Sequence, residues 1–276
     1  MEAPLEELIT IPRINEKIAR EIEKSAQETE RIEEELVELE DNGVGILTLH
    51  MSAYPENLRK ISSAPPVLFI KGEIERKDQQ AVAIVGSREA TTQGIKVAEE
   101  LAKRLSKAGF TIISGFARGI DTAAHRGALE NRGRTIAVFG SGINIIHPRE
   151  NSPLVEEICH QGAMLSECLP NEPPSSGRLL ARDRIISGLS LGVIIVESRE
   201  GGGAVDTARH AQKQGRAVFA IDWPEKSAAT QGNEQLLKEG VQAIRNYKEV
   251  TGIITRLKKV KILPESQIET SQLRLF

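Results

Sequence analysis

Short apolar runs alternate with longer amphipathic stretches over most of the chain. The apolar runs are rich in β-branched side chains and predict buried strands, whereas the stretches between them carry apolar residues at helical spacing. Expected strands cover residues 46–49, 65–72, 81–85, 111–114, 135–139, 163–166, 193–196, 217–221 and 241–244. Expected helices cover residues 58–61, 92–108, 152–160, 182–190, 205–214, 233–239 and 247–257, and one more follows residue 121. This alternation predicts an α/β fold with a doubly wound, mostly parallel sheet.

The amino-terminal segment has a different pattern. Residues 13–41 lack Gly and Pro and are rich in Glu, Ile, Leu, Lys and Arg, which predicts a helical arm. A seam at alternating spacings of four and three runs along it: Ile18, Ile22, Ser25, Thr29, Ile32, Leu36 and Leu39. Two interpretations stay open. The helix packs on its own domain or lies half-free, or it forms a coiled coil or binds a partner.

Glycine-rich loops follow several of the predicted strands. The strand 81–85 runs directly into Gly86-Ser87-Arg88, and the strand 111–114 is followed by a loop that contains Arg118. In a parallel sheet such loops meet at the carboxyl edge, where free N–H groups and helix N-termini attract phosphate. The candidate phosphate-binding residues are Gly86, Ser87, Arg88, Ser114, Gly115, Arg118, Gly119, Gly140, Ser141, Arg178, Arg182, Arg184 and Gly202. Several phosphate cradles along one edge fit a polyanion better than one small ligand.

Several function classes lack their sequence signals. The G-x-G-x-x-G pattern of dinucleotide-binding enzymes and the P-loop of ATPases are both missing, which argues against a nicotinamide enzyme and an ATPase. Cys159 and Cys168 form no zinc or redox motif, and we expect no metal and no cofactor. No signal peptide or apolar run of membrane length is found, so we expect a soluble, cytoplasmic protein without a membrane partner.

Four further side chains have a chemical and a structural interpretation. Asp121 and His125 share a helix face and form either an acid–base or metal pair, or a helix cap beside a locally bonded histidine. Glu197 ends a strand and is either catalytic or paired with an arginine. Trp223 follows a strand and either packs in a lid or stacks on a base.

Charge divides the 276-residue chain into an acidic arm and a basic body. Residues 1–41 carry 14 acidic and 5 basic side chains, a net charge of −9, so the remainder carries +6 although the whole chain carries only −3. Aromatic residues make up 3%, which leaves few platforms for base stacking. We expect an acidic helical arm at 1–42, the main domain at 43–250, and a short helix and tail at 251–276.

The chain resembles the DNA-processing protein A (DprA/Smf) family. The resemblance covers about residues 46–244 and is most specific in Ser-Gly-Phe-Ala-Arg-Gly-Ile-Asp-Thr-Ala-Ala-His-Arg-Gly-Ala-Leu at 114–129. It also rests on Ala-Val-Ala-Ile-Val-Gly-Ser-Arg at 81–88, on Thr-Ile-Ala-Val-Phe-Gly-Ser-Gly at 135–142 with His-Pro-Arg-Glu-Asn at 147–151, and on Arg-Asp-Arg-Ile-Ile-Ser-Gly-Leu-Ser at 182–190.

This resemblance implies an extended Rossmann-like domain that binds single-stranded DNA. It also implies a homodimer without catalytic activity that helps place RecA on single strands in natural transformation or DNA processing. By position, it implies a DNA pocket of Arg88, Ser114, Gly115, Arg118, Arg182 and Arg184. The sequence departs from the family pattern in two places. Near the pocket, Leu179 stands where an aromatic is usual and Asp183 replaces an asparagine, and the run Gly-Gly-Gly-Ala-Val-Asp-Thr at 201–207 replaces a Ser-Gly-Ser-Leu-Ile-Thr-like segment.

Two other functions remain as alternatives. Gly201-Gly202-Gly203, with Thr207 after it and Glu197 before it, is faintly similar to the Pro-Gly-Gly-x-Gly-Thr loop of phosphoribohydrolases. That similarity implies a Rossmann-like enzyme or sensor for a nucleotide-derived small molecule. The acidic amino-terminal helix suggests instead an adaptor that works through a protein partner.

Overall fold

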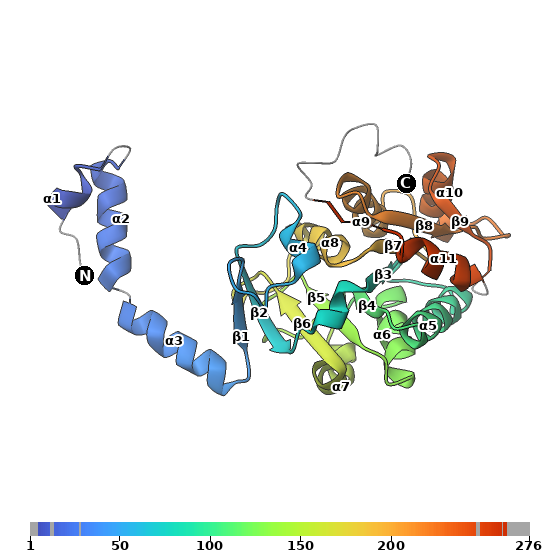
Figure 1. The fold of residues 1–276 in the computed structure, drawn as a ribbon, viewed down its shortest axis with the longest axis horizontal. Coiled ribbons are helices and arrows are strands. Elements are labelled where there is room, and N and C mark those ends of the chain that lie inside the picture. Colours follow the sequence, from blue (N-terminus) through green and yellow to red (C-terminus); the bar gives the residue numbers. More distant parts are fainter. Residues whose placement is uncertain (1–4, 12–13, 28, 247–248, 261, 264–276) are drawn as a thin grey trace. The chain divides into compact units, whose positions relative to one another are not determined.

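The structure is a computed structural model, and it describes residues 5–11, 14–27, 29–246, 249–260 and 262–263. The chain divides into two compact units, Met1–Gly45 and Ile46–Phe276. Both units are drawn in Figure 1. In the part of the chain that is described, no helix is both long and apolar enough to cross a bilayer.

The amino-terminal unit contains the helices α1 (Leu5–Leu8), α2 (Glu16–Gln27) and α3 (Thr29–Asp41). The single helix predicted for residues 13–41 is thus found as two helices, and positions 13 and 28 lie outside the described residues. Four apolar residues of the predicted seam are 37 to 47% exposed: Ile18, Ile22, Ile32 and Leu36. Docking of a partner on this seam stays a prediction.

One sheet dominates the second unit. Its nine described strands lie in the order β1-β2-β6-β5-β4-β3-β7-β8-β9. Their bounds are β1 (Gly45–Thr48), β2 (Val67–Gly72), β3 (Ala81–Val85), β4 (Thr111–Ser114), β5 (Thr135–Phe139), β6 (Gly162–Ser166), β7 (Gly192–Ile195), β8 (Ala217–Ile221) and β9 (Gln242–Ile244). Neighbouring strands from β6 to β9 pair in parallel, while β2 runs antiparallel to β6. The predicted doubly wound, mostly parallel sheet is therefore confirmed.

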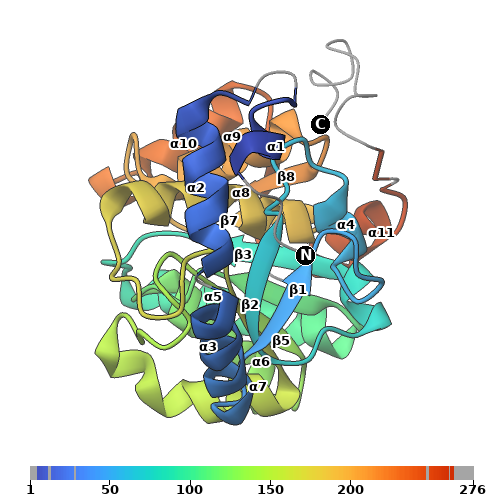
Figure 2. The ribbon, with the colours of Figure 1, turned by 90° about the vertical axis from the view of Figure 1, so that its left-hand side faces the viewer.

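Helices cover both faces of this sheet (Figures 1 and 2). One face packs against α5 (Thr92–Lys107), α6 (Ile120–Glu130) and α11 (Val250–Leu257), and the other against α4 (Glu56–Arg59), α8 (Ser176–Leu189), α9 (Gly203–Lys213) and α10 (Gln231–Lys238). Strand β3 shows the cause: Val82 and Ile84 join the first core, while Ala81, Ala83 and Val85 join the second. Successive side chains of a strand point to opposite faces, so an all-apolar strand needs cover on both sides.

Several helices differ from their predicted bounds, and two of them show the physical reason. Helix α8 begins at Ser176, six residues before the predicted start, because the Ser175 hydroxyl accepts from the Arg178 N–H at 3.3 Å and caps the first turn. The predicted helix 152–160 is a 3-10 helix over Arg149–Leu154 that contains Pro153, followed by α7 (Val155–Gln161). Short 3-10 helices also cover Arg76–Gln79 and Ala228–Thr230.

Candidate functional site

The strand order reverses between β3 and β7. From β3 the chain builds outward to β6, and then returns to place β7 on the other side of β3. Open α/β sheets bind ligands in the crevice beyond the carboxyl ends of the strands at such a point. A cavity of about 460 Å³ lies there and is called the switch-point cavity below. Its lining residues are Val85, Gly86, Ser87, Arg88, Glu89, Ala117, Asp121, Ser176, Leu179, Leu180, Arg182, Asp183, Ile186, Ser198, Arg199, Gly202, Gly203, Ala204 and Thr207.

The loop after β3 is fixed by close backbone contacts. The Ser87 N–H donates to the Glu197 carbonyl at 2.7 Å, and a Cβ on Gly86 would lie 2.7 Å from the same carbonyl oxygen. Gly119, at φ +73°, brings the next loop against it, where a Cβ would lie 2.3 Å from the Ser87 carbonyl oxygen. Only glycine fits these two positions, so the two loops can lie in close backbone contact at the rim of the cavity.

Arg88 is the exposed cation at this rim. Within the described parts of the chain, no residue forms a hydrogen bond or ion pair with its side chain. Arg199, which follows β7 as Arg88 follows β3, is also exposed but forms an ion pair with Glu89. Arg199 is not among the residues predicted from the sequence, although Ser87-Arg88 and Ser198-Arg199 repeat one pattern after two adjacent strands. A phosphate could therefore bind Arg88 without displacing a carboxylate, whereas at Arg199 it would have to displace Glu89.

Arg182 also lines the cavity, but its guanidinium is bound by the protein. It is 4% exposed and donates to the carbonyl oxygens of Gly115 and Val138, both at 2.5 Å. A Cβ on Gly115 would lie 2.3 Å from the Arg182 Nη1, so a larger residue there would displace the guanidinium. The Gly115 N–H donates in turn to Asp121 at 3.1 Å. Arg182 and Asp121 thus hold the loop after β4 from both sides.

The structure places other predicted residues outside the cavity lining. Arg118 pairs with Glu150, Arg178 with Glu172 and Arg184 with Glu167. Ser114 donates to the Ile84 carbonyl, Ser141 donates to the Ile145 carbonyl, and Gly140 packs against Leu179. The cavity brings together Gly86, Ser87, Arg88, Arg182 and Gly202 of the thirteen predicted residues. DNA binding by the other eight stays a prediction.

Two helices begin at the cavity. Helix α9 starts after Gly202, whose position offers no capping side chain, and Gly203 and Ala204 of its first turn line the cavity. The first turn of α8 contributes Ser176 and Leu179 to the lining. Free N–H groups and the helix dipole make the start of α9 favourable for an anion.

A carboxylate lies in the same cavity. Asp183 is 6% exposed, and its Oδ1 accepts from the Arg182 Nε at 3.1 Å. Burial raises the pKa of Asp183 to about 6, and the charges of Asp121 and Asp206 add to this while Arg182 opposes it. Asp183 is thus ionised at pH 8 and substantially protonated below pH 6.

Asp121 and His125 do not form an acid–base or metal pair. Asp121 binds the N–H groups of Gly115 and Ala117. The Thr135 hydroxyl uses its proton on the Ile112 carbonyl at 2.8 Å, so it accepts from the His125 Nδ1–H at 2.7 Å. His125 is fully buried, and burial followed by the charge of Arg182 lowers its pKa to about 3. The structural interpretation of both residues is the one that the contacts support.

Glu197 and Trp223 also have structural roles. Glu197 is 1% exposed and accepts from the backbone N–H and the hydroxyl of Thr91, the residue that caps α5. The predicted pairing of Glu197 with an arginine is therefore wrong. The Trp223 Nε1–H donates to the Val196 carbonyl at 2.7 Å, and the side chain is 6% exposed. It packs in the core, which leaves no face for a base.

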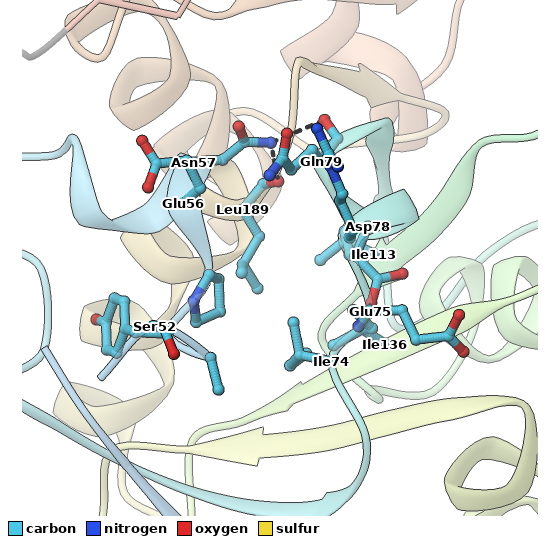
Figure 3. Close-up of a pocket in the computed structure, with 14 residues that line it drawn as sticks. Ser52, Glu56, Asn57, Ile74, Glu75, Asp78, Gln79, Ile113, Ile136 and Leu189 are labelled. Atoms are coloured by element: carbon cyan, nitrogen blue, oxygen red, sulfur yellow. Dashed lines mark hydrogen bonds between the residues drawn. The ribbon is translucent and has the colours of Figure 1, made fainter. Parts of the chain in front are cut away.

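A second cavity, of about 340 Å³, is lined in part by the segment that precedes β3 (Figure 3). Ile74, Ile113 and Ile136 are among its apolar lining residues. Its carboxylates Glu75 and Asp78 are paired with Arg134. This acidic, internally paired rim does not suit a phosphate. In the described residues, no group of three or more His, Cys, Asp or Glu side chains could hold a metal ion.

Comparison with known proteins identifies the family. The sequence model described as DNA recombination-mediator protein A matches residues 45–255. The DNA processing protein DprA of Streptococcus pneumoniae is 39% identical over 197 residues, which are 71% of this chain and 70% of that protein. DprA of Bacillus subtilis is 35% identical over 216 residues, 78% of this chain and 73% of that protein. Protein Smf of Escherichia coli is 39% identical over 198 residues, and the chain covers 53% of its length.

Solved structures agree with this result. The X-ray structure of DprA from Streptococcus pneumoniae superposes with a TM-score of 0.77 at 33% identity, covering 91% of this chain and 87% of that one. DprA from Helicobacter pylori superposes with a TM-score of 0.67 at 30% identity, covering 77% and 99%. The latter structure is described as showing a single-stranded DNA binding mode of that protein.

Proposed function

Because the chain belongs to the DNA recombination-mediator protein A family, we propose that it binds single-stranded DNA at the switch-point cavity. The observation that carries this proposal is Arg88, an exposed cation with no ion-pair partner among the described residues, at the rim of a cavity that also receives the uncapped start of α9. A phosphate placed there gains a charge-assisted hydrogen bond and the favourable helix dipole.

The walls of the cavity suit a nucleotide rather than a bare anion. Leu179, Leu180, Ile186 and Ala204 supply apolar surface, and the volume lies in the range of small-ligand sites. A base can lie against these aliphatic side chains while its phosphate meets Arg88. Since Leu179 replaces the aromatic expected from the resemblance, base stacking worth ~1–3 kcal/mol is missing, and phosphate contacts must carry more of the affinity.

We also propose a role for this protein in recombination. The protein acts as a homodimer without catalytic activity and assists RecA loading onto single strands in the cytoplasm, during natural transformation or DNA processing. The match of the family model to residues 45–255 supports residues 43–250 as the DNA-binding domain with the acidic arm 1–42 outside it, and it extends five residues into the segment 251–276. Light scattering that gives the mass of a monomer would refute the homodimer. If RecA filaments form on protected single strands no faster when the protein is present, the role in RecA loading is refuted.

Fluorescence anisotropy with a labelled oligo-dT tests the DNA site. We expect binding that weakens as salt rises, and a loss of roughly 10-fold or more in Arg88→Ala, because a hydrogen bond to a charged group contributes about 1.5–3 kcal/mol. The slope of log K against log salt should fall by about one unit in this variant.

Arg126→Ala is the matched control. Arg126 is an exposed arginine of α6 that does not line the cavity, so its removal changes the net charge equally. Equal losses in the two variants would place the DNA elsewhere. If wild type ignores oligo-dT at low salt but nucleoside monophosphates raise its melting temperature, the nucleotide-derived ligand of the alternative interpretation replaces DNA.

A further inference from the structure

The carboxylate of Asp183 is unusual in a cavity that faces phosphates. Its Oδ1 is used by the Arg182 Nε, but no described residue donates a hydrogen bond to its Oδ2. Oδ2 is not one of the fully buried side-chain atoms without a partner, so it must be accessible. Since Asp183 lines the cavity, Oδ2 is open to it. It also lies 3.7 Å from the position of a Cβ on Gly203, at the start of α9. One acceptor oxygen therefore faces the ligand space.

We propose that Asp183 Oδ2 selects the nucleobase by accepting a hydrogen bond from an exocyclic amino group, so that the cavity prefers cytosine to thymine. This inference rests on the proposed binding of single-stranded DNA. A carboxylate is a suitable partner for the cytosine N4 amino group, which offers two N–H donors. Thymine carries a carbonyl oxygen at the same ring position, and two acceptors facing each other across a buried site repel and stay unpaired.

The surroundings of Asp183 strengthen this selection. The side chain is almost fully enclosed, so a base that leaves Oδ2 unpaired removes its solvent without replacing the hydrogen bond. The charged groups that act on Asp183 are Arg182 on α8, Asp121 on α6 and Asp206 on α9. Arg182 keeps Oδ1 occupied and leaves a single oxygen free, which suits one amino group. Apolar Leu179 and Ile186 line the same cavity and supply surface for the face of the base.

Competition between two pyrimidine oligonucleotides tests the proposal. Labelled oligo-dC and oligo-dT of equal length are titrated by anisotropy at pH 8, where the carboxylate is ionised because the pKa of Asp183 is about 6. We expect wild type to bind oligo-dC roughly 5- to 10-fold more tightly, as one good hydrogen bond in a buried site would give. Equal affinities, or a preference for oligo-dT, would overturn the proposal whatever the variants show.

Two variants separate base selection from charge. In Asp183→Asn the side chain can also donate to a thymine carbonyl, so the ratio of the two affinities should fall to about one. Asp206→Asn removes the same charge from an exposed neighbour on α9 that does not line the cavity, and should keep the wild-type ratio. A ratio that falls equally in both variants would assign the effect to charge alone.

Failure of the inference and failure of the proposed function give different results. If neither oligonucleotide binds wild type, DNA binding and base selection both fall. If both bind and Arg88→Ala weakens them equally without a cytosine preference in wild type, the DNA site stands and the role of Asp183 does not. Thermal melting of each variant shows whether it is folded, and the wild-type ratio remains decisive if Asp183→Asn unfolds.

Discussion

His125 should make the stability of the protein fall between pH 7 and pH 5. Its imidazole is fully buried, its Nδ1–H is used on Thr135, and its Nε2 has no partner among the described residues. A proton on Nε2 would therefore place an unpaired charge in the core beside Arg182. This is why the pKa of His125 is lowered from 6.5 to about 3.

The size of the effect follows from proton linkage. In the unfolded chain, the His125 imidazole takes up a proton near pH 6.5. In the folded protein, the same imidazole remains neutral down to about pH 3. Stability due to this group is thus complete above pH 6.5 and is lost progressively as the pH falls toward 3. Between pH 7 and pH 5 the loss is about 2 kcal/mol, since one pKa unit corresponds to ~1.4 kcal/mol. For a domain of this size it lowers the melting temperature by roughly 4–8 °C.

Differential scanning fluorimetry at pH 7 and pH 5 measures this loss. The test compares the pH dependence of wild type with that of His125→Phe, which cannot titrate, so the contributions of carboxylates such as Asp183 cancel. We expect the variant to lose about 2 kcal/mol less than wild type on acidification. His160→Gln, at an exposed histidine of α7, should behave as wild type does. Parallel losses in wild type and His125→Phe would refute the reasoning.

Two further predictions concern the packing that supports the site. Gly127→Ala should destabilise the protein by about 1–3 kcal/mol in urea denaturation, because its Cβ would lie 2.2 Å from the Glu99 carbonyl oxygen, where α6 meets α5. Gly177→Ala in α8 meets nothing within 4 Å and serves as its control, so an equal shift in both variants would contradict the close approach of these helices. Glu197→Ala should cost about 1–3 kcal/mol, because the buried N–H of Thr91 loses its acceptor at 2.9 Å, and an unchanged urea midpoint would show that this contact contributes nothing.

Which of four arginines has a carboxylate partner could not be predicted from local sequence. Arg88, Arg118, Arg178 and Arg184 all lie in predicted loop or helix-start regions and are indistinguishable by residue type. The fold gives three of them a carboxylate partner, and the one belonging to Arg118 is Glu150, 32 positions along the chain. Arg88 alone of the four has no such partner among the described residues. Whether an arginine is available to bind a phosphate therefore depends on tertiary contacts, which the hydrophobic periodicity of the sequence does not reveal.

The sequence by itself determined the alternation of strands and helices and the glycine-rich turns that follow the strands. The predicted bounds of β3, β4, β5 and β8 match the structure, because runs of β-branched residues between turn residues have few other local solutions. Only the tertiary structure decided the strand order and the orientation of Asp183. Both depend on how chain segments that are distant in sequence pack against one another. This packing also decides whether a charged side chain makes a structural contact or stays free for a ligand.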